Sequence, residues 1–313
     1  MNTVHSFCVI IVAMLLGNLL PAAERLTDNP GNKLCPAFSP DGKKIAFICD
    51  QKGQKSVWLR DENGKSGELT AGNSFAWMDS RRFLYGRDDS IYVRDLNAPS
   101  DVLVTAGEKY VAGTDGAVYF SKDNYLWLKK PDGAPVKLTR QERMIFDFQV
   151  LEQGRRILMA ADGDLWMVDP EKGEESWMKV EPLEYYVGTK ISPDGAIAAV
   201  VSSGAKYAEG RGSWIFAVDL RDKSCRKIAE GDDPAWSPDG QSLVYAKAGT
   251  IRITDRTGGK SVLVSGAVGA SAKMPAWSPD GARVIFVSAR SDTNGDGKID
   301  WRDHDDLWME VIK

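Results

Sequence analysis

Four copies of the tetrapeptide Ser-Pro-Asp-Gly constrain this 313-residue chain more than any other feature. They occupy residues 39–42, 192–195, 237–240 and 278–281. In such a stretch proline presets φ, the aspartate caps its own backbone, and the glycine takes the positive φ that a tight turn needs. Each copy precedes an apolar segment, as in KIAFIC and RVIFVS, so each predicts a turn between two strands.

Weaker copies of the same unit fill the gap between the first and second clear ones. They read AWMDSRRFLYG at 76–86, VAGTDGAVYFS at 111–121 and FQVLEQGRRILMA at 148–160. The third residue of each turn then gives seven markers spaced 36 to 45 residues apart: Asp41, Asp79, Asp115, Gln153, Asp194, Asp239 and Asp280. A period of about forty residues is typical of propeller blades.

A later strand of each unit follows a shared pattern of an apolar, an aromatic and an apolar residue. The aromatic positions are Trp58, Tyr92, Trp127, Trp166, Phe216 and Trp308, and the sixth unit departs from the pattern with Arg252. Successive side chains on a strand point to opposite faces, so consecutive apolar residues indicate that both faces are covered. We therefore expect these aromatics to belong to the core between stacked blades.

The two ends of the chain complete one unit between them. A fourth strand closes the first six units, over 178–180 in the fourth unit, whereas the seventh stops at Lys313 after its third strand, and residues 24–27 supply a matching segment. The sequence predicts an all-β, seven-bladed β-propeller of four-stranded antiparallel blades, with six blades as the alternative. The expected blades are 34–72, 73–106, 107–140, 143–181, 185–230, 232–266, and 272–313 plus 24–28.

The N-terminal segment has the pattern of a secretory leader. An apolar run at 7–20 precedes Pro21-Ala22-Ala23, and it is shorter than a membrane span of about twenty residues. We expect a signal peptide over 1–23, a periplasmic or secreted protein and no stable membrane span after cleavage. The alternatives are an uncleaved anchor and a wrongly assigned start of the chain. Export leaves Cys35, Cys49 and Cys225, of which Cys35 and Cys49 can be either a cross-strand disulfide or two small buried residues.

The AFSPDGKKIAF and AWSPDG stretches, with their apolar-Trp-apolar continuations, resemble the WD40-like repeats of TolB-like propellers, a family of mostly bacterial envelope proteins. The resemblance implies the propeller fold and an envelope location. TolB itself has six blades and an additional N-terminal domain. This chain departs from both features, so a role in the Tol-Pal system is not implied.

One polar loop, SDTNGDGKIDWRD at 291–303, matches the register of a twelve-position calcium loop and is similar to the loops of dockerins. Its predicted ligands are Asp292, Asn294, Asp296, the carbonyl of Lys298, Asp300 and Asp303. The final position carries Asp in place of the longer Glu, which predicts a dissociation constant of about 10⁻⁴ to 10⁻³ M. We expect a structural Ca²⁺ here; the alternative is a solvated loop without metal.

Composition narrows the function. A net charge of −4 without a basic stripe excludes nucleic acid as an expected partner. After the leader the only histidine is His304, and no Gly-x-Ser-x-Gly motif occurs, which disfavours nucleophilic hydrolysis and propeller lyases that hold a metal through histidines.

The loop 204–213 opens on the same predicted face as the calcium loop and carries Tyr207 and Arg211, residue types favoured at interfaces. The alternative for this segment is a mobile glycine-rich loop without a partner. We therefore expect a monomeric, exported, non-catalytic scaffold that binds an envelope or extracellular protein, or a glycan. The alternative is a carbohydrate-active enzyme, a lyase or hydrolase, that uses paired carboxylates near the propeller channel.

Overall fold

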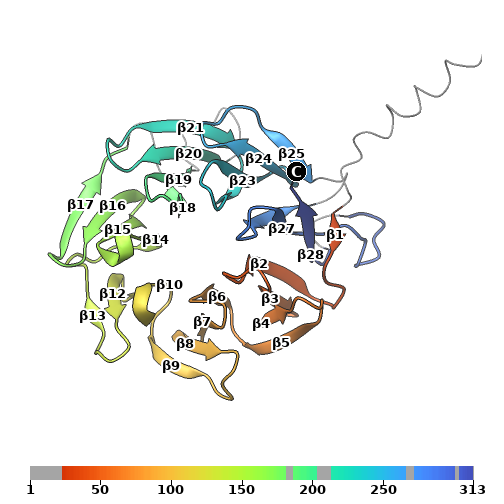
Figure 1. The fold of residues 1–313 in the computed structure, drawn as a ribbon, viewed down its shortest axis with the longest axis horizontal. Coiled ribbons are helices and arrows are strands. Elements are labelled where there is room, and N and C mark those ends of the chain that lie inside the picture. The colour runs from red at the N-terminus through yellow and green to blue at the C-terminus, as the bar shows by residue number, and fades with distance from the viewer. Residues whose placement is uncertain (1–22, 181–185, 203–212, 266–270, 300–302, 313) are drawn as a thin grey trace, which may run out of the picture.

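Seven four-stranded antiparallel sheets stand around a common axis in the computed structural model of the protein (Figure 1). The structure describes residues 23–180, 186–202, 213–265, 271–299 and 303–312. The predicted seven-bladed, all-β propeller is confirmed. Within the described residues no helix is long and apolar enough to cross a membrane.

Each blade runs from an inner strand near the axis to an outer edge strand. Blade 1 comprises β2 (Asn32–Phe38), β3 (Ile45–Gln51), β4 (Gln54–Arg60) and β5 (Ser66–Ala71); blade 2 comprises β6 (Ser74–Trp77), β7 (Arg82–Arg87), β8 (Ser90–Asp95) and β9 (Val102–Ala106). Blade 3 comprises β10 (Tyr110–Ala112), β11 (Val118–Lys122), β12 (Tyr125–Lys129) and β13 (Val136–Lys137); blade 4 comprises β14 (Ile145–Leu151), β15 (Arg156–Ala161), β16 (Asp164–Asp169) and β17 (Glu174–Met178).

The remaining blades follow the same order. Blade 5 comprises β18 (Tyr186–Ile191), β19 (Ile197–Ser202), β20 (Trp214–Asp219) and β21 (Cys225–Glu230); blade 6 comprises β22 (Asp232–Trp236), β23 (Ser242–Lys247), β24 (Thr250–Asp255) and β25 (Val262–Ser265). Blade 7 comprises β26 (Lys273–Trp277), β27 (Arg283–Ser288), β28 (Asp306–Val311) and β1 (Glu24–Arg25). Two short 3₁₀ turns, η1 (Thr114–Gly116) and η2 (Glu152–Gly154), lie between the first two strands of blades 3 and 4.

Strand β1 closes the ring as the sequence predicts. Glu24 pairs with Met309 and Arg25 with Trp308, and Figure 1 shows β1 beside β28. The next residue, Leu26, donates its N–H to the carbonyl of Leu307 at 2.7 Å, and its buried side chain joins the core of blades 7 and 1. Strand β1 therefore covers the edge of β28 and joins the two ends of the chain in one blade.

A buried polar cluster connects the N-terminal residues to β28. The Asp306 carboxylate, only 5% exposed as a residue, accepts a hydrogen bond from Thr27 Oγ1 at 3.2 Å and pairs with Arg25 at 2.5 Å. The Lys33 ammonium lies 3.5 Å from the same carboxylate and donates to the carbonyl of Gly31 at 2.8 Å. Desolvation lowers the pKa of the fully buried Lys33, and the Asp306 charge opposes that shift.

The four Ser-Pro-Asp-Gly turns share one hydrogen-bond pattern. In each, the serine hydroxyl donates to the aspartate two residues on and accepts the backbone N–H five residues on. Ser237, for example, donates to Asp239 at 2.5 Å and accepts from Ser242 at 2.9 Å. This bond from the serine is the largest cause that lowers the pKa of each turn aspartate: Asp41, Asp194, Asp239 and Asp280.

Inner-strand tryptophans connect three blades, 2, 6 and 7, to the blade before each. The indole N–H of Trp236 donates to the carbonyl of Lys190 at 2.9 Å, that of Trp277 to Ala235 at 3.2 Å, and that of Trp77 to Ala37 at 3.4 Å. The Ala-Trp pairs of the sequence thus provide hydrogen bonds between neighbouring blades. The third-strand aromatics pack as expected, with Phe216 buried and the others half-buried against their core clusters.

Two local expectations need adjustment. The outer strand of blade 4 is Glu174–Met178, whereas the sequence pattern placed it over 178–180. The three cysteines outside the leader are free thiols. A register shift between Leu34 and Ala37 places Cys35 in an inner-strand bulge, while Cys49 pairs with Lys33 across the hairpin, so the two thiols do not face each other.

Candidate active site at the channel mouth

The inner strands do not line the axis uniformly. Register shifts interrupt β2, β14, β18, β22 and β26, whereas β6 and β10 pair without interruption. A bulge adds one residue to a strand and re-aims the neighbouring side chains, which is common beside functional sites. In three bulges a residue with positive φ precedes a proline: Cys35 (49°), Asp233 (51°) and Met274 (52°).

These bulges connect neighbouring blades through hydrogen bonds. The N–H of Met274 donates to Asp233 Oδ2 at 3.0 Å, and the N–H of Cys35 donates to the sulfur of Met274 at 3.4 Å. In the same manner the N–H of Thr189 donates to Asp147 Oδ2 at 2.9 Å. Each of these inner side chains is therefore held in place by the following blade.

A cavity of about 320 Å³ lies among the bulges of blades 4, 5 and 6, and we call it the channel mouth. Its lining residues are Phe146, Asp147, Gly188, Thr189, Lys190, Val201, Asp233 and Pro234. Phe146 is 42% exposed, which is unusual for a large aromatic side chain. The channel mouth thus combines an open apolar surface with two carboxylates and an amine, a mixture that suits a small polar ligand.

The two carboxylates of the channel mouth have different surroundings. Asp147 accepts three hydrogen bonds, from the N–H of Phe148 at 2.9 Å, the N–H of Thr189 at 2.9 Å and the Thr189 hydroxyl at 3.1 Å. Both carboxylate oxygens of Asp147 therefore already accept hydrogen bonds from protein groups. For Asp233 the one hydrogen bond found among the described residues comes from Met274 N–H.

The pKa of Asp233 is raised by its surroundings. Solvent reaches its side chain, yet the surrounding blades remove part of its hydration, and this desolvation raises the pKa of Asp233. The charge of Asp232 raises it further, against the Met274 hydrogen bond and the charges of Lys273 and Lys190. A carboxyl with a raised pKa in a cavity is a candidate general base or acid.

Lys190 supplies the positive charge of the channel mouth. Its side chain is exposed, and no ion pair to it is found among the described residues. Its carbonyl is held by the Trp236 indole at 2.9 Å, which fixes the backbone from which the side chain projects. The nearby Lys273, in contrast, is paired with the buried Asp305 at 2.6 Å.

The sequence did not single out Asp147, Lys190 or Asp233 by residue, although it placed candidate carboxylates near the channel. One available signal was the X-Pro-Ala-aromatic stretch ahead of three of the turns, at Cys35, Asp233 and Met274. The sequence does not reveal that the residue before the proline forms a bulge beside the axis. The bulge becomes visible only in the strand pairing of the structure.

The predicted calcium loop lies between β27 and β28 of blade 7. Asp292 accepts N–H bonds from Gly295 at 2.6 Å and Gly297 at 2.8 Å, and Asn294 Oδ1 accepts one from Asp296 at 2.9 Å. Asp303 is 1% exposed and accepts the N–H groups of Thr293 at 2.7 Å and Asn294 at 3.2 Å. The two ends of the loop are therefore joined through Asp303.

Other predicted site residues fall elsewhere. Lys298 is exposed in the same loop, and Asp300, Tyr207 and Arg211 lie outside the described residues. Exposed His304 donates its backbone N–H to the Thr293 hydroxyl at 2.8 Å. Across the described ranges, no three histidine, cysteine, aspartate or glutamate side chains form a group that could hold a metal ion.

Comparison with solved structures finds enzymes that share the whole fold. An oligogalacturonate lyase in complex with manganese matches with a TM-score of 0.68 and 16% identity over 94% of both chains, and an oligogalacturonate lyase from Vibrio parahaemolyticus matches with 0.66 and 15% over 93% of both. TolB from Acinetobacter baumannii matches with 0.48 and 16% over 74% of this chain and 54% of its own, too weakly to carry a conclusion. No family model and no curated protein matches the sequence.

This comparison corrects the expected function. The non-catalytic scaffold that the sequence favoured is wrong, because two solved propellers that match this chain over 94% and 93% of its length are lyases. The scarcity of histidine disfavours nucleophilic hydrolysis and lyases that hold a metal through histidines. It does not disfavour acid–base catalysis by carboxylates. The carbohydrate-active alternative is the better supported of the two functions.

Proposed function

We propose that this protein is a carbohydrate-active enzyme that cleaves an acidic oligosaccharide at the channel mouth by β-elimination. The observation that carries the proposal is the presence of Asp233, with its raised pKa, and the exposed, unpaired Lys190 in one cavity of the described structure. The full-length likeness to oligogalacturonate lyases supports the choice of a uronate-containing substrate.

In the proposed reaction the Asp233 carboxylate removes the proton from the carbon next to the sugar carboxylate. Lys190 neutralises that carboxylate as negative charge spreads onto it, which lowers the barrier. The bond from the neighbouring carbon to the glycosidic oxygen breaks, a carbon–carbon double bond forms, and the proton on Asp233 passes to the departing oxygen. Phe146 offers an apolar surface against which a sugar ring can pack.

Manganese, which one of the similar lyases holds, is not given a step in this scheme. Both Asp147 oxygens are engaged by N–H and hydroxyl donors, and the described residues offer no group of three metal-binding side chains. The donor set of the channel mouth therefore does not fit a resident metal, and the proposal assigns the proton transfer to Asp233.

The test is turnover of acidic oligosaccharides by the purified protein, followed through the ultraviolet absorbance of the new double bond. We expect turnover by the wild type and a loss of about a hundredfold or more in Asp233→Asn, because general-base catalysis contributes on that scale. The matched control, Asp232→Asn, removes a neighbouring charge outside the cavity lining and should keep turnover near neutral pH. Absence of turnover across acidic substrates, or full activity in Asp233→Asn, would refute the proposal.

We also propose that the loop containing Asp292, Asn294, Asp296, Lys298, Asp300 and Asp303 binds a structural Ca²⁺. Support comes from the alternating oxygen side chains and from the buried Asp303, which joins the two ends of the loop. At about 10 mM calcium, a dissociation constant of about 10⁻⁴ to 10⁻³ M corresponds to about 1 to 3 kcal/mol of stabilisation. A melting midpoint that is the same in calcium and in chelator would count against the site.

For location and partners we propose an exported, monomeric protein in the periplasm or outside the cell, with a glycan as its partner. The leader-like sequence at 7–20 supports export. Tyr207 and Arg211 remain candidate glycan contacts from blade 5. Replacing both should weaken oligosaccharide binding while the melting temperature stays unchanged.

A further inference from the structure

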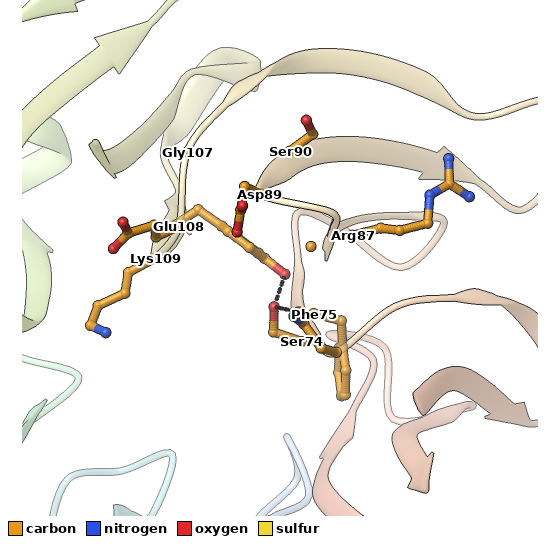
Figure 2. A pocket seen from close by; sticks show the side chains of 11 residues that line it. Ser74, Phe75, Arg87, Asp89, Ser90, Gly107, Glu108 and Lys109 are labelled. Carbon is orange, nitrogen blue, oxygen red and sulfur yellow. Dashed lines mark hydrogen bonds between the residues drawn. The ribbon is translucent and has the colours of Figure 1, made fainter. Parts of the chain in front are cut away.

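We infer that a second sugar site, for a neutral saccharide unit, lies between blades 2 and 3. A cavity of about 400 Å³ opens there, within the size range of small-ligand sites. Its lining comes from the start of β6, the turn between β7 and β8, and the link from β9 to β10 (Figure 2). We call it the blade 2–3 cavity. The choice of a saccharide as ligand rests on the proposed function.

The floor of the blade 2–3 cavity is a fixed pair of hydroxyl groups. Ser74 Oγ and the Tyr110 hydroxyl are 2.8 Å apart, one from the inner strand of each blade. Desolvation raises the pKa of Tyr110, so its phenol stays protonated. Gly86 makes room for the pair, because a Cβ there would lie 2.7 Å from Ser74 Oγ and 3.3 Å from Tyr110 Cε1.

The rim presents charged side chains from a well-anchored backbone. The N–H of Glu108 donates to the carbonyl of Ser121 at 2.9 Å, and the carbonyl of Lys109 accepts the N–H of Ser121 at 2.9 Å. The N–H of Gly107 donates to the carbonyl of Asp89 at 3.0 Å, which connects the two segments of the rim. Within the described chain, no ion pair or hydrogen bond is found for the side chains of Asp89, Glu108 and Lys109.

Arg87 belongs to the lining but its charge is directed elsewhere. Figure 2 shows its side chain extending away from Glu108 and Lys109, which point together to the opposite side. The guanidinium lies over the rings of Tyr92, at 4.5 Å, and Tyr85, at 5.8 Å. Besides Arg87, the lining carries two carboxylates and one ammonium, and no ion pair to these three side chains is found among the described residues.

This combination selects for a neutral sugar. Hydroxyl groups of a sugar can donate to Asp89 and Glu108 and accept from Lys109, and the half-buried Phe75 adds an aromatic wall. The side-chain oxygens of Asp89 and Glu108 have no partner among the described residues, so they can accept hydrogen bonds from sugar hydroxyl groups. At the channel mouth both Asp147 oxygens already accept hydrogen bonds from the protein, and the exposed Lys190 is available to a sugar carboxylate. Both cavities include residues at the start of inner strands, so they open on the face that carries the links between blades.

The test is titration of the full-length protein with neutral monosaccharides and, separately, with galacturonate, by calorimetry or by NMR of the protein. We expect binding of a neutral sugar that is weakened about tenfold in Glu108→Gln and in Tyr110→Phe, because a hydrogen bond to a charged or buried group is lost. The exposed Glu62→Gln in blade 1 is the matched control and should bind as the wild type does. Melting curves check that each variant folds.

The outcomes separate this site from the channel mouth. Neutral-sugar binding that persists in Asp233→Asn supports two distinct sites. Neutral-sugar binding without turnover of any acidic substrate would refute the proposed enzyme and leave the blade 2–3 cavity supported. Absence of neutral-sugar binding at millimolar concentration, equal affinity in wild type and Glu108→Gln, or stronger binding of galacturonate than of neutral sugars would overturn the inference.

Discussion

Blades 5, 6, 7 and 1 differ from blades 2, 3 and 4 in how they build the same sheet. The first group keeps the Ser-Pro-Asp-Gly turn, in which one serine hydroxyl satisfies an aspartate and a backbone N–H. In blades 3 and 4 the turn is a short 3₁₀ segment with positive φ at Asp115 and Gln153, and no side chain caps it. Blade 2 uses Asp79, which caps Arg81 and Arg82.

The contrast extends to the space between blades. Three cavities, of about 400, 810 and 350 Å³, are lined by blades 2 to 4, where the repeats are weakest. The inner strands of blades 6, 7 and 1 are instead joined by the bulge hydrogen bonds of Asp233 and Met274. These three cavities thus accompany the weak repeats, whereas the channel mouth lies where the strong repeats of blades 5 and 6 meet blade 4.

The largest expected effect concerns the closure of the ring. Leu26→Ala removes a buried side chain from the core of blades 7 and 1, so we expect a loss of about 2 to 5 kcal/mol in the free energy of unfolding. Leu103→Ala, on the outer strand of blade 2 where the side chain is 59% exposed, should change it by less than about 0.5 kcal/mol. Denaturant unfolding measures both, and equal effects would mean that β1 does not complete the ring.

The next effect tests whether the weak-repeat blades are loosely or specifically packed. In Gly107→Ala the new Cβ would lie 2.6 Å from Phe120 Cδ2 and 2.9 Å from Ile91 Cδ1, so we expect destabilisation of about 1 to 3 kcal/mol. Gly67→Ala in blade 1 meets no atom within 4 Å and serves as the control. If thermal unfolding shows no cost for Gly107→Ala, the packing beside the blade 2–3 cavity is looser than described.

A smaller effect compares the two kinds of turn. Ser278→Ala leaves a backbone N–H and Asp280 without the buried hydroxyl that served both, which should cost about 1 to 2 kcal/mol. Thr114→Ala in blade 3 removes an exposed side chain that caps nothing, so its cost should stay below about 0.5 kcal/mol. Similar unfolding midpoints for the two variants would remove the distinction between the turns.

The smallest expected effect is a pH dependence. Because the pKa values of Asp41, Asp194, Asp239 and Asp280 are lower in the fold than in the unfolded chain, their contribution is present above about pH 4 and is lost as pH falls through the folded values. Asp239→Asn cannot titrate, so stability measured at pH 5 and pH 3 should fall less than in the wild type. An equal fall in both proteins would contradict this origin.

The fold could be predicted because its signals are local and repeated. Four identical turns, a period of about forty residues and a spare N-terminal strand are all readable from the chain, and β1 pairs with β28 as expected. The outer strand of blade 4 was misplaced because no turn signal fixes its register.

The sequence predicted the type of candidate site, carboxylates near the channel, but not the residues that form it. Asp147, Lys190 and Asp233 come from three blades, and their approach depends on bulges that no sequence pattern announces. The motif that was readable, the polar loop of Asp292 and its neighbours, belongs to another blade and contributes nothing to that cavity. The proposed enzyme function was placed second to a scaffold for the same reason, since carboxylates that meet in space are scattered in sequence.

The pH dependence of kcat/KM on an acidic oligosaccharide, measured for the wild type and Asp232→Asn, tests the central claim most directly. If Asp233 is the base, activity requires its ionised form, so kcat/KM should fall on the acidic side with an apparent pKa above the ordinary aspartate value of about 4. Removing the Asp232 charge should move that fall to lower pH. An acidic limb at the ordinary value, or one identical in both proteins, would contradict the assignment of Asp233.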